Sequence, residues 1–282
     1  MKIFVTGAAG QVGREVCDLF GAAPQHEVIA AGHGALDVGD RDAVMQAITS
    51  STPDAVVHCA AWTAVDACES DPDRAFRVNA LGARNVGEAC NRVGAHLLYV
   101  STDYVFDGEK LDSYVEWDAP NPRSVYGRSK LGGEIEAGDA ATIVRTSWVC
   151  GEHGANMVKT ILRLSNEHDT FSFVDDQRGH PTLAAELAKM IARLLVDRRP
   201  GVFHVTNQGA VSWFEFAGAV LTAAGLDPAR VLPISTAELK PPRPAPRPAN
   251  SVLDNAALRL GGIEPLPDFH EPLARLVRSL TS

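Results

Sequence analysis

The stretch that decides the fold lies at the N-terminus and reads Ile3-Phe4-Val5-Thr6-Gly7-Ala8-Ala9-Gly10-Gln11-Val12-Gly13. Its apolar start predicts a buried strand, and apolar residues at helical spacing after Val12 predict a helix. Glycines between a strand and a helix let the backbone approach a pyrophosphate, to which the helix N-terminus offers N–H groups and a positive dipole. We therefore expect Gly7, Gly10 and Gly13 to bind a dinucleotide cofactor.

The second predicted strand, 28–31, ends without the carboxylate that many NAD-binding proteins use to hold the ribose 2′-hydroxyl. Gly32-His33-Gly34 stands there instead. Since no carboxylate repels a 2′-phosphate, we expect NADP(H), and use of NAD(H) also stays open. Asp37 has two interpretations, a contact to the adenine or a cap for a helix over 41–48, and the pattern favours neither.

Strand and helix patterns alternate along the first half of the chain. Further strands are expected at 55–59, 97–101 and 141–145, and a helix over 71–93 with Phe76, Val78, Leu81, Val86 and Ala89 buried. This alternation predicts an α/β fold, a doubly wound parallel sheet (Rossmann-like) with a smaller C-terminal substrate-binding domain. The expected domains are 1–150 for the dinucleotide and 151–282 mainly for the substrate. Part of 170–206 is expected to return to the first domain, because 202–205 reads as a strand.

Composition limits the classes of partner. The chain has 282 residues, is 45% apolar and carries a formal net charge of −9, which argues against nucleic acid and anionic membranes as partners. No apolar run approaches the ~18 residues of a membrane span. The five cysteines form no Cys-x-x-Cys, which indicates reduced thiols in a cytoplasmic protein, and no Cys/His cluster has the spacing of a metal site.

Tyr126 and Lys130 are four residues apart, so on a helix they share one face. A nearby ammonium favours the phenolate and lowers the pKa of a tyrosine, which makes the pair a candidate proton donor with its tuning group. Thr102 follows the strand 97–101, at the sheet edge where ligands bind in this fold, and can donate a hydrogen bond to a carbonyl. Small residues close the strand 55–59, as suits a cofactor lying across its end.

With the glycine turn, these residues resemble the extended short-chain dehydrogenase/reductase superfamily. Longer segments resemble one group within it, the dTDP-4-dehydrorhamnose reductase family. They span nearly the whole chain in order: 60–66, 78–86, 101–108, 145–149, 174–182 and 247–251. The resemblance implies NADP(H)-dependent reduction of the 4-keto group of a dTDP-4-keto-6-deoxyhexose, dTDP-4-dehydro-L-rhamnose to dTDP-L-rhamnose.

The resemblance also implies roles for individual residues. Tyr126 donates the proton, Lys130 binds the nicotinamide ribose and holds the pKa of the tyrosine down, and Thr102 orients the keto oxygen. Asp103 and Trp148 contact the sugar. The residues implied to line the cofactor are Gly10, Gln11, Val12, Asp37, Val38, Ala60, Ala61, Trp62 and Thr63.

The chain departs from the family pattern at several positions. Trp62 stands where tyrosine or histidine is usual, and Cys150 where tyrosine is usual. These departures leave cofactor preference and the exact sugar open. Some members carry Mg²⁺ at a dimer contact, where Glu15 matches one ligand. We recognise no full metal set in this chain, and a homodimer stays open.

A proline-rich segment, 240–248, excludes helix and central strand because proline lacks the N–H group. One interpretation is an extended surface loop or a ligand for proline-binding modules. We favour a rigid lip that offers Arg243 and Arg247 to the diphosphate of the substrate.

Three other functions compete with this one. Dehydratases of the superfamily place an Asp-Glu pair after the threonine, but here Asp103 is followed by Tyr104, which argues against a dehydratase or epimerase. A reductase of another deoxysugar nucleotide would share the same motifs. A non-catalytic NADP-binding regulatory subunit would not need the proton donor that this chain retains.

Overall fold

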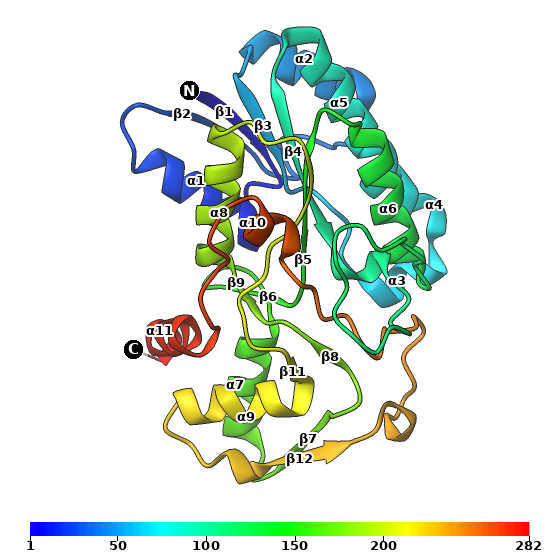
Figure 1. Ribbon diagram of the computed structural model, residues 1–282, viewed down its shortest axis with the longest axis vertical. Coiled ribbons are helices and arrows are strands. Elements are labelled where there is room, and N and C mark those ends of the chain that lie inside the picture. Colours follow the sequence, from blue (N-terminus) through cyan, green and yellow to red (C-terminus); the bar gives the residue numbers. More distant parts are fainter. Residues whose placement is uncertain (282) are drawn as a thin grey trace.

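A six-stranded sheet forms the centre of the computed structural model, which describes residues 1–281 (Figure 1). All its neighbouring strands pair in parallel, in the order β10-β5-β4-β3-β1-β2. The strands are β1 (Lys2–Thr6), β2 (Glu27–Ala31), β3 (Ala55–His58), β4 (His96–Thr102), β5 (Thr142–Thr146) and β10 (Gly201–His204). The expected α/β class with a parallel sheet is confirmed.

Helices cover both faces of this sheet, which confirms the doubly wound arrangement. On one face lie α1 (Gln11–Gly21) and α8 (Ala184–Val196); on the other lie α2 (Arg41–Ser51), α5 (Gly82–Val93) and α6 (Val125–Ala137). Side chains alternate along β1, so that Ile3 and Val5 pack toward the first pair and Phe4 toward the second group. Strand β1 is therefore buried on both sides, as its apolar run predicted.

The helix expected over 71–93 forms in three pieces, with a π-helical turn in its middle. They are α4 (Pro72–Phe76), the π turn Arg77–Leu81 and α5, preceded by the short helix α3 (Val65–Ser70). Val86 and Ala89 are buried as expected, but Phe76 and Leu81 are 39% and 43% exposed, so the expectation for these two is wrong. A π turn adds residues to the helical repeat, and a regular period of 3.6 therefore does not carry one face through it.

The second half of the chain forms a smaller apolar cluster below the sheet in Figure 1. It contains α7 (Met157–Glu167), α9 (Trp213–Ala223), α11 (His270–Thr281) and the parallel pair β7 (Phe171–Val174) and β12 (Val231–Ile234). Two short pairs link it to the rest: β6 (Val149–Cys150) with β9 (Thr182–Leu183), and β8 (Arg178–Gly179) with β11 (Val211–Ser212). Among the described residues, no helix is both long and apolar enough to cross a membrane.

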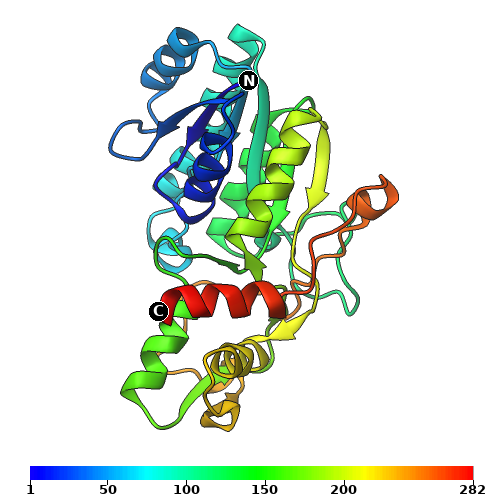
Figure 2. The same cartoon turned by 90° about the vertical axis from the view of Figure 1, so that its left-hand side faces the viewer.

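Strand β10 and helix α8 lie with the first sheet although they come late in the chain (Figure 2). The division into domains at residue 150, with part of 170–206 belonging to the first domain, stays a prediction. The last residue of the expected second domain, Ser282, lies outside the described residues.

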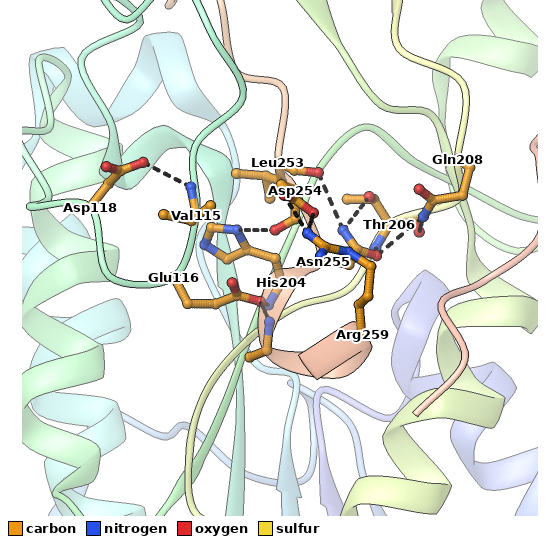
Figure 3. Close-up of polar contacts among 11 residues, drawn as sticks. Val115, Glu116, Asp118, His204, Thr206, Gln208, Leu253, Asp254, Asn255 and Arg259 are labelled. Carbon is orange, nitrogen blue, oxygen red and sulfur yellow. Dashed lines mark hydrogen bonds and ion pairs between the residues drawn. The ribbon is translucent and has the colours of Figure 1, made fainter. Parts of the chain in front are cut away.

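A buried polar network holds β10 and the short helix α10 (Ala256–Leu260) together (Figure 3). Glu116 Oε1 accepts the N–H groups of His204, at 2.9 Å, and Ala257, at 3.1 Å. The His204 ring donates from Nδ1 to the Asp254 carbonyl at 3.0 Å, and burial lowers the pKa of His204 to about 3, so the ring is neutral. These contacts satisfy buried backbone groups at the edge of the sheet.

Candidate active site

The glycine turn joins β1 to α1 as expected. Gly7 adopts a positive φ of 64°, which favours glycine. A Cβ on Gly13 would stand 2.3 Å from the Gly7 carbonyl oxygen, so only glycine lets the helix pack this closely on the turn. Gly10 caps the helix and has no side chain to bond the first N–H groups, which suits a bound phosphate.

One cavity of about 510 Å³ brings most of the predicted site together. Its walls come from the glycine turn, the ends of β4 and β5, and the start of α6. The predicted residues that line it are Gly7, Gly10, Gln11, Val12, Gly13, Ala61, Thr63, Thr102, Asp103, Tyr126, Lys130 and Trp148. Residues more than 100 positions apart therefore face one ligand space, at the carboxyl ends of the strands.

A second cavity of about 230 Å³ adjoins the first at the glycine turn, and Asp37, Val38, Ala60 and His33 line it. The Asp37 carboxylate accepts the Gly39 N–H at 2.9 Å and Arg77 Nη1 at 3.0 Å. These two contacts lower the pKa of Asp37. The cap of α2 is Asp40, which accepts the N–H groups of residues 42 and 43. The capping interpretation of Asp37 is therefore wrong.

Trp62 differs from the other predicted cofactor residues, because it lines neither cavity and packs against the cluster of Cys68, Ala75, Val125 and Tyr126. The Arg74 guanidinium lies 4.5 Å from the ring centroid. The backbone N–H and carbonyl of Trp62 both bond the Asn79 side chain, at 2.7 and 3.1 Å, and Asn79 also donates to Ser129 of α6 at 2.9 Å. In the sequence, Asn79 falls within the segment 78–86 and no role was predicted for it. Its place in the π turn lets this buried amide tie the 60–63 segment to α6.

Helix α6 presents Tyr126 and Lys130 to the large cavity on one face, as their spacing predicted. Ser124 caps the helix by accepting the Gly127 N–H at 3.0 Å. A Cβ on Gly127 would meet the Tyr104 carbonyl at 2.2 Å, so this glycine lets α6 approach the segment after β4. Tyr126 is 8% exposed and its ring meets that of Tyr104 edge-on, with centroids 5.7 Å apart.

Burial dominates the electrostatics of the pair. It raises the pKa of Tyr126 above its usual range, and the hydrogen bond with Thr102 lowers it in part. The expectation that Lys130 holds this pKa down is therefore wrong for the chain without ligand, because burial outweighs the lysine. Burial also lowers the pKa of Lys130 to about 7, which the neighbouring Glu134 carboxylate opposes. The Lys130 ammonium donates to the Val100 carbonyl at 2.7 Å and lies 4.0 Å from the Tyr99 ring centroid.

Thr102 and Asp103 lie at the end of β4, both almost fully buried. Thr102 Oγ1 donates to Asp103 Oδ1 at 3.0 Å, and Asp103 Oδ2 has no hydrogen-bond partner in the described part of the chain. Burial raises the pKa of Asp103 to about 6, although the hydroxyls of Ser251 and Thr102 lower it. A buried carboxyl beside a candidate proton donor suits a ligand that supplies a hydrogen-bond donor.

A third cavity, of about 370 Å³, is lined mainly by residues of the second half of the chain. Tyr104 lines both this cavity and the large one, and sequence reasoning noted it only as the residue after Asp103. Trp148, with a positive φ of 45°, stacks on Trp213 with centroids 3.7 Å apart; Trp148 lines the large cavity and Trp213 the third. Such backbone strain concentrates at functional sites.

Arg243 and Arg247 both line the third cavity. Arg247 is already engaged: its Nη1 and Nη2 donate to the Asp66 carboxylate at 2.5 and 2.8 Å. Arg243 lies 3.8 Å from the same carboxylate, and its side chain is 52% exposed. The proline-rich lip is thus fastened to α3, and one of its arginines is held in place by a partner within the chain.

Glu15, the residue that matches a family metal ligand, lies beside a separate cavity with Glu152, His153 and Glu186. Glu186 is paired with Lys189 at 3.1 Å and Arg275 at 2.7 Å. Within residues 1–281, no three His, Cys, Asp or Glu side chains form a group that could hold a metal ion. The Glu186 carboxylate is therefore already paired with two cationic side chains.

A family model, curated relatives and solved structures all indicate the same protein family for this chain. The model of the RmlD substrate binding domain matches residues 1–282. A dTDP-4-dehydrorhamnose reductase from Streptomyces griseus is 45% identical over 281 residues, covering 95% of this chain and 90% of the relative. A crystal structure of a dTDP-4-dehydrorhamnose reductase from Clostridium acetobutylicum is similar with a TM-score of 0.96, 39% identity and full coverage of both chains. The enzyme from Bacillus anthracis, crystallised with NADP, has a TM-score of 0.94, 38% identity and 99% coverage of each chain.

Proposed function

Because the chain belongs to the RmlD family of dTDP-4-dehydrorhamnose reductases, we propose that it reduces the 4-keto group of dTDP-4-dehydro-L-rhamnose with NADPH, giving dTDP-L-rhamnose in nucleotide-sugar biosynthesis. The observation that carries the proposal is that Thr102, Tyr126 and Lys130 line one cavity with the glycine turn. When bound, NADPH supplies the hydride for the keto carbon.

Thr102 and Tyr126 stabilise the oxygen on which charge develops. Both hydroxyls line the same cavity, and each carries a single hydrogen. A keto oxygen placed between them accepts from both once the Thr102 hydroxyl turns away from Asp103 Oδ1. Tyr126 then gives its proton to that oxygen. Burial keeps the phenol protonated at neutral pH, which suits a proton donor, and its ionisation becomes favourable only beside a cation.

Lys130 supplies that cation from one turn further along α6. Its ammonium bonds the Val100 carbonyl, which leaves two of its three N–H donors for a ribose hydroxyl or the phenolate. Burial brings the pKa of Lys130 down to about 7 in the protein alone. The developing phenolate favours the charged form.

We further propose that the sugar lies between Asp103 and Trp148 and that the thymidine diphosphate extends into the third cavity. Tyr104 lines both cavities, and Arg243 and Arg247 at the lip offer positive charge to a diphosphate. His33 in the adjoining cavity, with no carboxylate at the end of β2, supports preference for the 2′-phosphate of NADPH over NADH.

The test is Tyr126→Phe, assayed by the fall in NADPH absorbance with dTDP-4-dehydro-L-rhamnose and by product analysis. We expect a loss of at least about 10³-fold in kcat, the upper part of the range for general acid catalysis, with an unchanged Kd for NADP⁺. Normal turnover in this variant would refute the assignment. A wild-type protein that binds NADP⁺ but reduces no sugar nucleotide would instead favour a regulatory subunit.

A further inference from the structure

A buried ion pair lies about two turns along α6 from the candidate proton donor. Glu134 on α6 and Arg145 on β5 have side chains that are 7% and 4% exposed. Arg145 Nε and Nη2 donate to the two Glu134 oxygens at 2.9 and 2.7 Å, and Ser101 Oγ donates to Oε1 at 2.5 Å. This bidentate pair therefore joins α6, β4 and β5 at the level of the large cavity.

Glu134 lies on the same helix as the candidate proton donor and its lysine. Tyr126, Lys130 and Glu134 follow one another at intervals of four residues, so they lie in one row on the helix. Ser101, bound to Glu134, directly precedes Thr102 in β4. The Glu134 carboxylate thus bonds strand β4, which carries Thr102. It also lies next to Lys130, which we propose supplies the cation for Tyr126.

Burying such a pair is costly, because both charges lose their hydration. Arg145 also keeps Nη1 without a hydrogen-bond partner among the described residues, with the Phe106 ring centroid 5.2 Å from its Cζ. Apolar side chains of similar volume often stabilise a fold as well as a buried ion pair does. Stability alone therefore does not account for the charges.

We propose that Glu134 is a positioning residue for the reductase reaction: its buried carboxylate holds Lys130 in the ammonium form and fixes Thr102 relative to Tyr126. The inference deepens the proposed function and rests on it. The Glu134 carboxylate acts on Lys130 Nζ, one helical turn away, and accepts a hydrogen bond from the Ser101 hydroxyl.

Among the neighbours of Lys130, the Glu134 carboxylate has the largest effect in raising the pKa of the lysine. Burial lowers the pKa of Lys130 to about 7, and Glu134 is the larger of the two neighbours that oppose this fall. Burial lowers the pKa of His58 and raises the pKa values of Cys59, Tyr99 and Tyr126. All four side chains near Lys130 are therefore neutral around pH 7. Arg145 faces Glu134 from β5 with the opposite sign. Of the groups named here, only Glu134 therefore brings a negative charge that favours the ammonium.

The experiment is the pH profile of kcat/KM for NADPH in wild type and Glu134→Gln, since this parameter reports groups of the free enzyme. Activity needs Lys130 charged, so it falls as pH rises through the pKa of Lys130. Loss of one adjacent negative charge lowers that pKa. We expect the alkaline midpoint to move down by about one pH unit. Ser101→Ala, which removes a hydrogen bond to Glu134 but no charge, should lower kcat without moving the midpoint.

Glu134→Gln leaves Arg145 buried without its partner, so the double variant Glu134→Gln/Arg145→Met is made beside it. It removes both charges and retains side chains of similar size. Because loss of the Arg145 charge acts in the opposite direction, the downward shift should be smaller than in Glu134→Gln. A second readout is the pH titration of the Lys130 signal in protein labelled with ¹³Cε-lysine, assigned by Lys130→Met. It measures the pKa without turnover.

A shifted midpoint in either folded variant, matched by the lysine titration, supports the proposal. An unchanged midpoint in a folded variant overturns it, whatever the loss in kcat, because a purely structural role lowers activity at every pH. Failure of the proposed function looks different: wild-type protein would then reduce no sugar nucleotide, while the lysine titration would still report the effect of Glu134.

Discussion

Replacing Asp103 by asparagine should make the protein more stable at pH 8 and no more stable at pH 4. Asp103 is 2% exposed in the large cavity, and burial raises its pKa from 3.8 to about 6. Since the folded state holds the proton more tightly than the unfolded chain, the wild-type protein loses stability as pH rises from 4 to 6. Asparagine is neutral throughout and avoids this loss.

The magnitude follows from the size of the shift. A difference of about two pKa units corresponds to about 3 kcal/mol, at roughly 1.4 kcal/mol per unit. The amide group would occupy the place of Oδ2, which has no hydrogen-bond partner among the described residues, and its unpaired N–H groups cost about 1 kcal/mol. We therefore expect a net gain of about 2 kcal/mol at pH 8 and a loss of about 1 kcal/mol near pH 4.

The assay is urea unfolding of both proteins at several pH values between 4 and 8. The result to compare is the difference in free energy of unfolding, wild type against Asp103→Asn, as a function of pH. A difference that stays constant across this range would refute the reasoning, because it would mean that the carboxyl titrates alike in the folded and unfolded states.

Two further variants test how the backbone and the lip position ligands. Gly13→Ala should weaken NADP⁺ binding at least about tenfold, since its Cβ would stand 2.3 Å from the Gly7 carbonyl oxygen and displace the turn. Gly21→Ala is the control, because its Cβ meets nothing within 4 Å. Equal Kd values for NADP⁺ in the two variants would contradict this prediction. Asp66→Asn should raise KM for the sugar nucleotide about fivefold, equivalent to the 1 kcal/mol of a partly exposed ion pair with Arg247, and leave the Kd for NADP⁺ unchanged; a KM like that of wild type would show that the lip does not depend on this contact.

Local patterns in the sequence were enough to predict the parallel sheet and many of the residues that line the large cavity. The run 3–5 is uniformly apolar and is buried on both faces of the sheet. The spacing of Tyr126 and Lys130 placed both on one face of α6, since a helix has a fixed period. The same reasoning failed at Phe76 and Leu81, where a π turn interrupts that period, and at Asp37, because Asp40, three residues later, caps the helix.

The sequence by itself determined the strands of the parallel sheet, the helix that carries Tyr126 and Lys130, and the phosphate turn, because these depend on contacts within a few residues. Only the tertiary structure decided which side chains from distant segments meet. It joined Arg247 to Asp66, 181 positions apart, and Glu134 to Arg145 and Ser101 on two different strands. Strand order and helix packing set such pairings, and no local period encodes them, so the charges that surround the reacting groups become visible only once the chain is folded.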